Sequence, residues 1–167
     1  MSPMNTLSAP GASSTGGLSL DYKTAISGLV EHGDWEGFFR KPDLGVMEHP
    51  LLLLDRSGRA DFCYEIGDRG RLFVEDDDAP KTLNNLMTYW RWCAANPDVR
   101  PVHLVHVIGS ASGVFVEHCR FLKPRIEADL KRNLFQYHIV THDFQWRDPQ
   151  RWLPDIRTVL GGIVASQ

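Results

Sequence analysis

The chain has 167 residues, of which 43% are hydrophobic and 23% charged, with a formal net charge of −3. This length and composition fit one globular domain that can bury a sizeable core. The slight negative charge excludes a protein that coats nucleic acid through its overall charge, although it permits a local basic patch.

The cysteines and the apolar runs indicate the environment of the chain. Cys63, Cys93 and Cys119 are far apart and form no CxxC pair, which argues against a zinc knuckle or a disulfide framework and favours a cytoplasmic protein. No apolar run approaches the ~20 residues that span a bilayer, so no membrane partner is expected. Residues 1–19 are rich in Ser, Gly, Ala and Pro and lack the features of a secretory signal. We expect them to form a disordered tail before a single α/β domain at 20–167.

The first half of the domain predicts a helix and three strands. Residues 22–32 carry apolar side chains on one helical face, and strand-like runs follow at 49–55, 60–66 and 71–75. Short glycine-containing turns separate the three runs. Because such turns cannot hold a crossover, the runs are expected to form an antiparallel meander.

From Pro80 the hydrophobic period changes to steps of three and four. This predicts a helix at 80–96, with Trp90 in the core and Tyr89 and Trp92 off the apolar stripe. The rest of the chain predicts a buried strand at 101–109, a helix at 113–133 kinked or split by Pro124, a strand at 134–144, and a last helix from the Asp148-Pro149 start signal to Leu160. The order α-β-β-β-α-β-α-β-α predicts one mixed sheet with flanking helices.

Four carboxylates in a row, Glu75-Asp76-Asp77-Asp78, end the third strand. In a strand, Glu75 and Asp77 share one face. One interpretation is a solvated acidic turn in which Asp78 caps the next helix, worth ~1 kcal/mol. The other is a metal site, since carboxylates ~5 Å apart repel by ~3 kcal/mol at an effective dielectric near 20 and a hard divalent cation offsets that repulsion.

An upstream acid favours the metal interpretation. Asp61 is expected to open the middle strand of the meander, 75 − 61 = 14 residues before Glu75. Because the two strands are antiparallel neighbours, these acids can converge at one edge of the sheet. Such a pair could bind Mg²⁺ or Mn²⁺ and activate water to attack a phosphodiester.

The arrangement Arg59-Ala60-Asp61 … Val74-Glu75-Asp76-Asp77, in a meander flanked by helices, resembles the PD-(D/E)xK restriction-endonuclease-like superfamily. The common core of that superfamily runs α-β-β-β-α-β, which matches residues 22–109. The resemblance implies a restriction-endonuclease-like fold and a divalent-metal-dependent nuclease. It places the metal ligands at Asp61 and Glu75.

The chain departs from the superfamily pattern at two positions. Ala60 stands in place of its proline, and Asp77 in place of the lysine that positions the attacking water and stabilises phosphate charge. Asp77 then becomes an auxiliary acid. Lys81, one turn into the next helix, is a candidate substitute, because the lysine of the superfamily also occurs on that helix. An E-x-D arrangement is similar to some plasmid-replication-associated members.

Other residues suggest weaker sites. His138 and His142 share a strand face but lack a recognisable third zinc ligand, so we interpret them as polar residues of a half-buried face. Cys119 beside His118 is interpreted as structural, since helical neighbours point about 100° apart.

The helix at 113–133 is locally basic. Its candidate phosphate contacts are Arg120, Lys123, Arg125 and Lys131. The alternative is an ordinary solvated face, in which these side chains alternate with acids.

The first hypothesis for the function of the chain is a Mg²⁺- or Mn²⁺-dependent nuclease. The second is a non-catalytic module that keeps the fold, binds a protein or nucleic-acid partner, and is compatible with a homo-oligomer.

Overall fold

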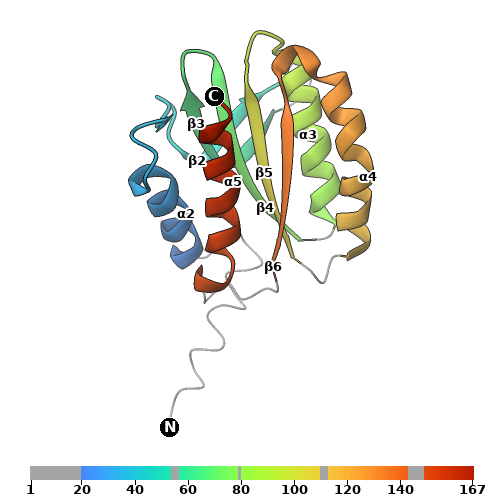
Figure 1. The fold of residues 1–167 in the computed structure, drawn as a ribbon. Coiled ribbons are helices and arrows are strands. Elements are labelled where there is room, and N and C mark those ends of the chain that lie inside the picture. The colour runs from blue at the N-terminus through green and yellow to red at the C-terminus, as the bar shows by residue number, and fades with distance from the viewer. Residues whose placement is uncertain (1–19, 54–56, 79, 110–112, 143–148) are drawn as a thin grey trace.

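The structure is a computed structural model that describes residues 20–53, 57–78, 80–109, 113–142 and 149–167. The predicted tail (residues 1–19) and the predicted helix start at Asp148 lie outside the described residues. Within them, one mixed six-stranded sheet is flanked by four helices (Figure 1). The α/β class and the single mixed sheet are therefore confirmed.

The helices are α2 (Leu20–His32), α3 (Lys81–Ala95), α4 (Gly113–Asp129) and α5 (Leu153–Ala165), with short 3₁₀ turns η2 (Lys131–Asn133) and η3 (Pro149–Arg151). The strands are β1 (Phe39–Arg40), β2 (Met47–Leu52), β3 (Ser57–Ile66), β4 (Gly70–Asp77), β5 (Val102–Gly109) and β6 (Gln136–His142).

The sheet has an antiparallel half and a parallel half. Its order is β1-β3-β4-β5-β6, and β2 also pairs with β3. The pairs β2–β3 and β3–β4 are antiparallel, as the meander prediction required, whereas β4–β5 and β5–β6 are parallel. The parallel pairs are joined by α3 and α4, which have the length that such crossovers need.

Two helical layers cover the two faces of the sheet, and each closes a separate part of the core. Helices α2 and α5 lie on one face, and α3 and α4 on the other (Figure 1). Alternate residues of the central strands serve the two sides: Leu72 and Val74 pack towards α2 and α5, whereas Phe73 packs towards α3 and α4. The residues of β5 are buried throughout.

Four details differ from the sequence predictions. The segment expected to be irregular contains β1. Helix α4 runs without a break through Pro124, whose exposed position lets water satisfy the carbonyl group that the proline leaves unpaired. The strand preceding α3 extends to Asp77, and α5 begins at Leu153 and continues to Ala165.

The assignment of aromatic residues on α3 was also wrong. Tyr89 is 1% exposed, whereas Trp90 is only partly buried and donates from Nε1 to Oδ2 of Asp129 over 2.6 Å. Because α3 lies against both the sheet and α4, its buried surface is wider than a single stripe.

A buried amide fixes the end of α3 to the rest of the domain. Nδ2 of Asn133, in η2, lies 3.2, 2.9 and 3.0 Å from the carbonyl oxygens of Cys93, Asn96 and Val99. These contacts satisfy carbonyl groups at the end of α3 and in the turn that leads to β5. No helix in the described ranges is long and apolar enough to cross a membrane.

Candidate functional site: a buried carboxylate cluster

Asp61 and Glu75 meet where the ladder between β3 and β4 ends. The last recorded pair of that ladder is Phe62 with Val74. Beyond it, side chains replace the backbone ladder: the Asp61 N–H donates to Oε1 of Glu75 over 3.3 Å, and the Asp76 N–H donates to Oδ2 of Asp61 over 2.8 Å. The prediction that the acids of the two strands converge is confirmed.

Glu75 and Asp77 project from the same face of β4, towards α3. They are 3% and 4% exposed. Nδ2 of Asn85 bridges them, 3.2 Å from Oε2 of Glu75 and 2.6 Å from Oδ1 of Asp77, and the Tyr89 hydroxyl donates to Oε1 of Glu75. The interpretation of the acidic run as a solvated turn is therefore wrong.

Asp77 also contacts the parallel half of the sheet. Oδ2 of Asp77 lies 2.6 Å from Nε2 of His106 on β5, and Nδ1 of that imidazole lies 2.6 Å from the Tyr137 hydroxyl on β6. His106 and Tyr137 are fully buried. Three neighbouring strands thus contribute to one polar network beneath α3.

Asp76 faces the opposite side of β4. Its Oδ1 atom lies 3.4 Å from Nε2 of His142 and accepts no hydrogen bond in the described part of the chain. We call Asp61, Glu75, Asp76 and Asp77 the carboxylate cluster.

Asp78 does not cap α3 through its side chain, contrary to the sequence prediction. The N-cap residue is Pro80, which makes no side-chain cap hydrogen bond. Instead the Asp78 carbonyl oxygen accepts from the Lys81 N–H over 3.0 Å. Because α3 begins at Lys81, the N-cap position falls on Pro80, two residues after Asp78, and Oδ1 of Asp78 accepts no hydrogen bond in the described part of the chain.

Burial and mutual repulsion raise the proton affinity of Asp61, Glu75 and Asp76. Burial raises the pKa of Asp61 from 3.8 to about 7, although the hydrogen bond from the Asp76 N–H opposes the shift. The pKa values of Glu75 and Asp76 are raised well above their usual range, first by burial and then by the charge of Asp61. The donors described for Glu75 are neutral N–H and O–H groups, so they do not cancel its charge.

Lys81, the candidate replacement for the missing lysine, lies at the first residue of α3 and is exposed. Its charge acts on Asp78, where it partly offsets the rise in pKa that burial causes. No described contact joins the Lys81 side chain to Glu75 or Asp77.

The basic residues of the α4 region are interleaved with acids. Arg120 pairs with Glu117 at 2.8 Å, and Lys123 with Glu127 at 2.6 Å. Arg125 is exposed on α4, and Lys131 is exposed but lies in η2. The structure therefore shows a mixed-charge surface.

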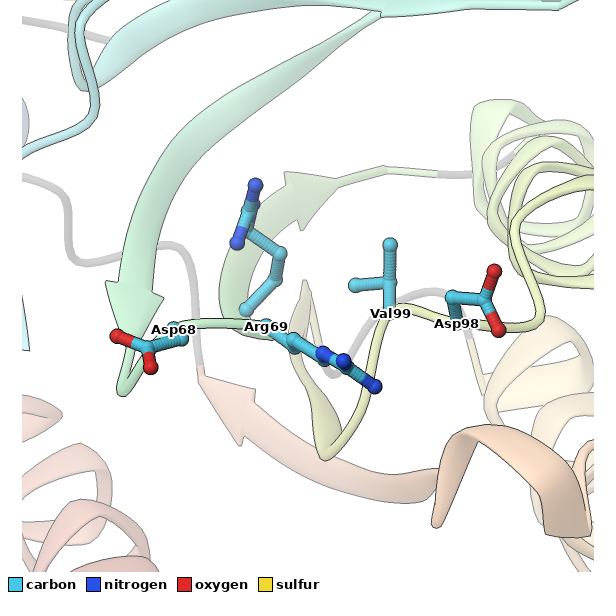
Figure 2. Close-up of a pocket in the computed structure, with 5 residues that line it drawn as sticks. Asp68, Arg69, Asp98 and Val99 are labelled. Atoms are coloured by element: carbon cyan, nitrogen blue, oxygen red, sulfur yellow. The ribbon is translucent and has the colours of Figure 1, made fainter.

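A surface hollow lies at the opposite end of the sheet from the cluster. It is lined by Asp68, Arg69, Arg71, Asp98 and Val99, which come from the β3–β4 turn, the start of β4 and the segment before β5 (Figure 2). Arg71 and Glu75 are four residues apart on β4, which is roughly 13 Å. The hollow therefore does not open onto the carboxylates.

Sequence reasoning missed Asn85, Tyr89, His106 and Tyr137. Along α3, successive steps of four residues lead from Lys81 to Asn85 and Tyr89, so the three side chains share one helical face. This spacing could have shown that Asn85 and Tyr89 lie on the same side of the helix as the candidate lysine. His106 and Tyr137 gave no comparable signal, because their approach to Asp77 depends on the register between strands.

In the described ranges, no group of three or more His, Cys, Asp or Glu side chains is placed to hold a metal ion. Comparisons with protein-family models, with curated proteins and with solved structures give no match.

Proposed function

We propose that this protein is a divalent-cation-dependent phosphodiesterase of the nuclease type, with Asp61 and Glu75 as the cation ligands. One observation carries the proposal: each of the carboxylates of Asp61 and Glu75 accepts a hydrogen bond from the backbone of the neighbouring strand in a mostly buried position, and the donors described for Glu75 are neutral. Buried carboxylates need a counter-charge, which is either a proton or a cation.

The donor atoms fit a hard cation in their chemistry. Mg²⁺ and Mn²⁺ prefer carboxylate oxygens, and Mg²⁺ is often held by one or two carboxylates while it keeps several waters. A site with Asp61 and Glu75 alone is consistent with the absence of a three-residue metal group among the described residues. When bound, such a cation would lower the pKa of a water molecule and stabilise negative charge on a phosphate.

The surrounding residues would fix the ligands. Asn85 and Tyr89 hold the Glu75 carboxylate, and the backbone N–H of Asp76 holds Asp61. Asp77 is the auxiliary acid of this proposal, and its hydrogen bonds to Asn85 and His106 fix its position. Lys81 would have to reach the substrate from the surface of α3.

The proposed substrate is a nucleic acid, whose phosphates would be contacted by Arg120, Lys123, Arg125 and Lys131. Arg125 and Lys131 are the stronger candidates of the four, because neither forms an ion pair in the described part of the chain. Contacts to phosphate predict binding that weakens steeply with salt.

A second candidate function is a non-catalytic binding module on the same fold. The observation that favours it is the position of Asp77, which stands where the superfamily has its lysine and is committed to buried hydrogen bonds. Without that lysine, a bound cation would lack a partner in stabilising the phosphate.

Calorimetric titration of Mn²⁺ and Mg²⁺ at neutral pH tests the cation site. We expect saturable binding to the wild type and to Glu65→Gln, a control carboxylate on β3, and no binding to Glu75→Gln. Absence of binding to the wild type would overturn the cation site. If the cation binds, the protein and the cation are incubated with plasmid DNA, single-stranded DNA and RNA. Cleavage that Glu75→Gln abolishes supports the nuclease. Binding of a nucleic acid without cleavage supports the non-catalytic module.

A further inference from the structure

The outer face of α4 carries large apolar side chains in solvent. Phe121 is 78% exposed and Val114 is 68% exposed. The buried side of the same helix is formed by Val116, Cys119 and Ile126. Helix α4 lies at the margin of the molecule, with α3 beside it (Figure 1).

The exposed positions form a continuous stripe. Residues 114, 117, 121, 124 and 128 follow one another in steps of three and four, and all five are exposed. This is the spacing with which one helix meets another along a seam. The stripe has Phe121 at its centre, apolar or small residues at its ends, and Glu117 between Val114 and Phe121.

The charges beside the stripe are complementary under two-fold symmetry. Glu117 and Arg125 lie four residues before and four residues after Phe121. If two α4 helices pack antiparallel about Phe121, Glu117 of each copy faces Arg125 of the other, and Val114 faces Ala128. A two-fold interface repeats each contact, so it would contain two such ion pairs.

We propose that two copies of this chain associate through the outer faces of their α4 helices, antiparallel and centred on Phe121. Arg125 then gains an acidic partner that it lacks in the described part of its own chain. A nucleic acid fits this stripe less well, because the centre of the stripe is the apolar side chain of Phe121 and the negative charge of Glu117 would face a phosphate. The proposal uses no residue of the carboxylate cluster, but it assigns Arg125 to the dimer interface and leaves Lys131 as the stronger of the proposed phosphate contacts.

The size of the surface sets the expected strength. A single pair of helices covers less than the roughly 800 Å² per partner of a standard stable interface. We therefore expect a dimer that forms and dissociates with protein concentration.

Analytical ultracentrifugation over a wide range of protein concentration tests the proposal. The wild type is expected to shift from monomer to dimer, and Phe121→Asp to weaken association by roughly tenfold or more. Leu52→Asp, at a position that is 71% exposed on β2, is the matched control and should dimerise as the wild type does. A wild type that stays monomeric, or a control that dissociates as Phe121→Asp does, would overturn the interface.

Charge reversal tests the register. Glu117→Arg and Arg125→Glu each place like charges opposite one another and should weaken the dimer, whereas the double variant restores opposite charges and should restore the dimer. Failure of the double variant to recover would overturn the antiparallel register. Electrophoretic mobility shift with labelled DNA is the second readout: if the single reversals change DNA binding and leave the oligomeric state unchanged, the face binds nucleic acid and the proposal is wrong.

Discussion

His106 and Asp77 form a buried pair between neighbouring parallel strands, with Nε2 of the imidazole 2.6 Å from Oδ2 of the carboxylate and side-chain exposures of 0% and 2%. The other ring nitrogen, Nδ1, lies 2.6 Å from the Tyr137 hydroxyl, so both nitrogens of the buried imidazole have a polar neighbour. The pair therefore fixes the orientation of the imidazole as well as the position of Asp77.

Removing the imidazole should destabilise the fold strongly. His106→Leu deprives Asp77 of a buried donor, and breaking a buried pair on one side typically costs about 3–5 kcal/mol. Urea denaturation at neutral pH gives the free energy of unfolding. His118→Leu, at an exposed position on α4, is the control and should change stability by less than about 0.5 kcal/mol. Equal stability of the two variants would contradict the assigned role of the pair.

The Asp61 carboxyl should contribute a loss of stability to the metal-free protein as pH rises from about 4 to about 7, because its pKa is about 7 in the folded protein against the ordinary 3.8. His103 and His138 contribute the opposite change, because burial lowers their pKa values from 6.5 to about 4. The Asp61 contribution is therefore the difference between the wild type and a variant that lacks this carboxyl. We expect the Asp61 contribution to be about 3–4 kcal/mol across the window, since each unit of difference in pKa is worth roughly 1.4 kcal/mol. Urea titrations at several pH values measure it.

The matched variants for this effect are Asp61→Asn and Asp68→Asn. Asp61→Asn should become more stable relative to the wild type as pH rises, and it should unfold at higher urea concentration than the wild type at pH 8. Asp68→Asn removes an exposed carboxylate from the β3–β4 turn and should keep the wild-type slope. A difference in stability between the wild type and Asp61→Asn that stays constant over this window would rule out the raised pKa.

A bound divalent cation should replace the protons as counter-charge. If Mn²⁺ binds at Asp61 and Glu75, it stabilises the folded state by about 2.7 kcal/mol at a concentration 100 times its dissociation constant. Thermal unfolding with and without Mn²⁺ at pH 7.5 measures this shift. The shift should be absent in Glu75→Gln. A shift of equal size in that variant would show that the cation binds at another site.

Asn133 should contribute more to the free energy of unfolding than its position in a short 3₁₀ turn suggests. Its buried amide approaches three carbonyl oxygens, so Asn133→Ala leaves acceptors unsatisfied and should cost about 1–3 kcal/mol. Asn133→Asp should cost more, since a carboxylate cannot donate and repels the same oxygens. Calorimetric unfolding compares both with Asn84→Ala, an exposed control on α3, and Asn133→Ala should not match that control.

The order of the elements could be predicted from sequence because hydrophobic period and glycine turns are local signals. The approach of Asp61 to Glu75 could also be predicted, because a short turn joins their strands and leaves little choice of register. The error at Asp78 had a local origin as well: a carboxylate before a proline resembles a helix cap whether or not the strand continues to that point.

The rest of the cluster could not be predicted, since it depends on long-range pairing. Glu75 is opposite His106 in the parallel ladder, and that register is set only after α3 has crossed the sheet. Tyr89 is buried against β4, with its ring centroid 5.1 Å from that of Phe73, so its burial depends on how α3 lies across the sheet.

The edge strands β6 and β2 carry features that hinder pairing with a strand of another molecule. At β6, the Tyr137 N–H, which could otherwise pair with a foreign strand, donates to Oε2 of Glu127 on α4 over 2.8 Å. At β2, Pro50 has no N–H to offer, and Glu48 has a left-handed backbone with φ of 54° that disturbs a regular edge. Exposed strand edges are the usual templates for cross-β growth, and these features obstruct such growth at both edges. These features therefore oppose the joining of two copies through their sheet edges, and a contact between α4 helices, as proposed above, would leave both edges free.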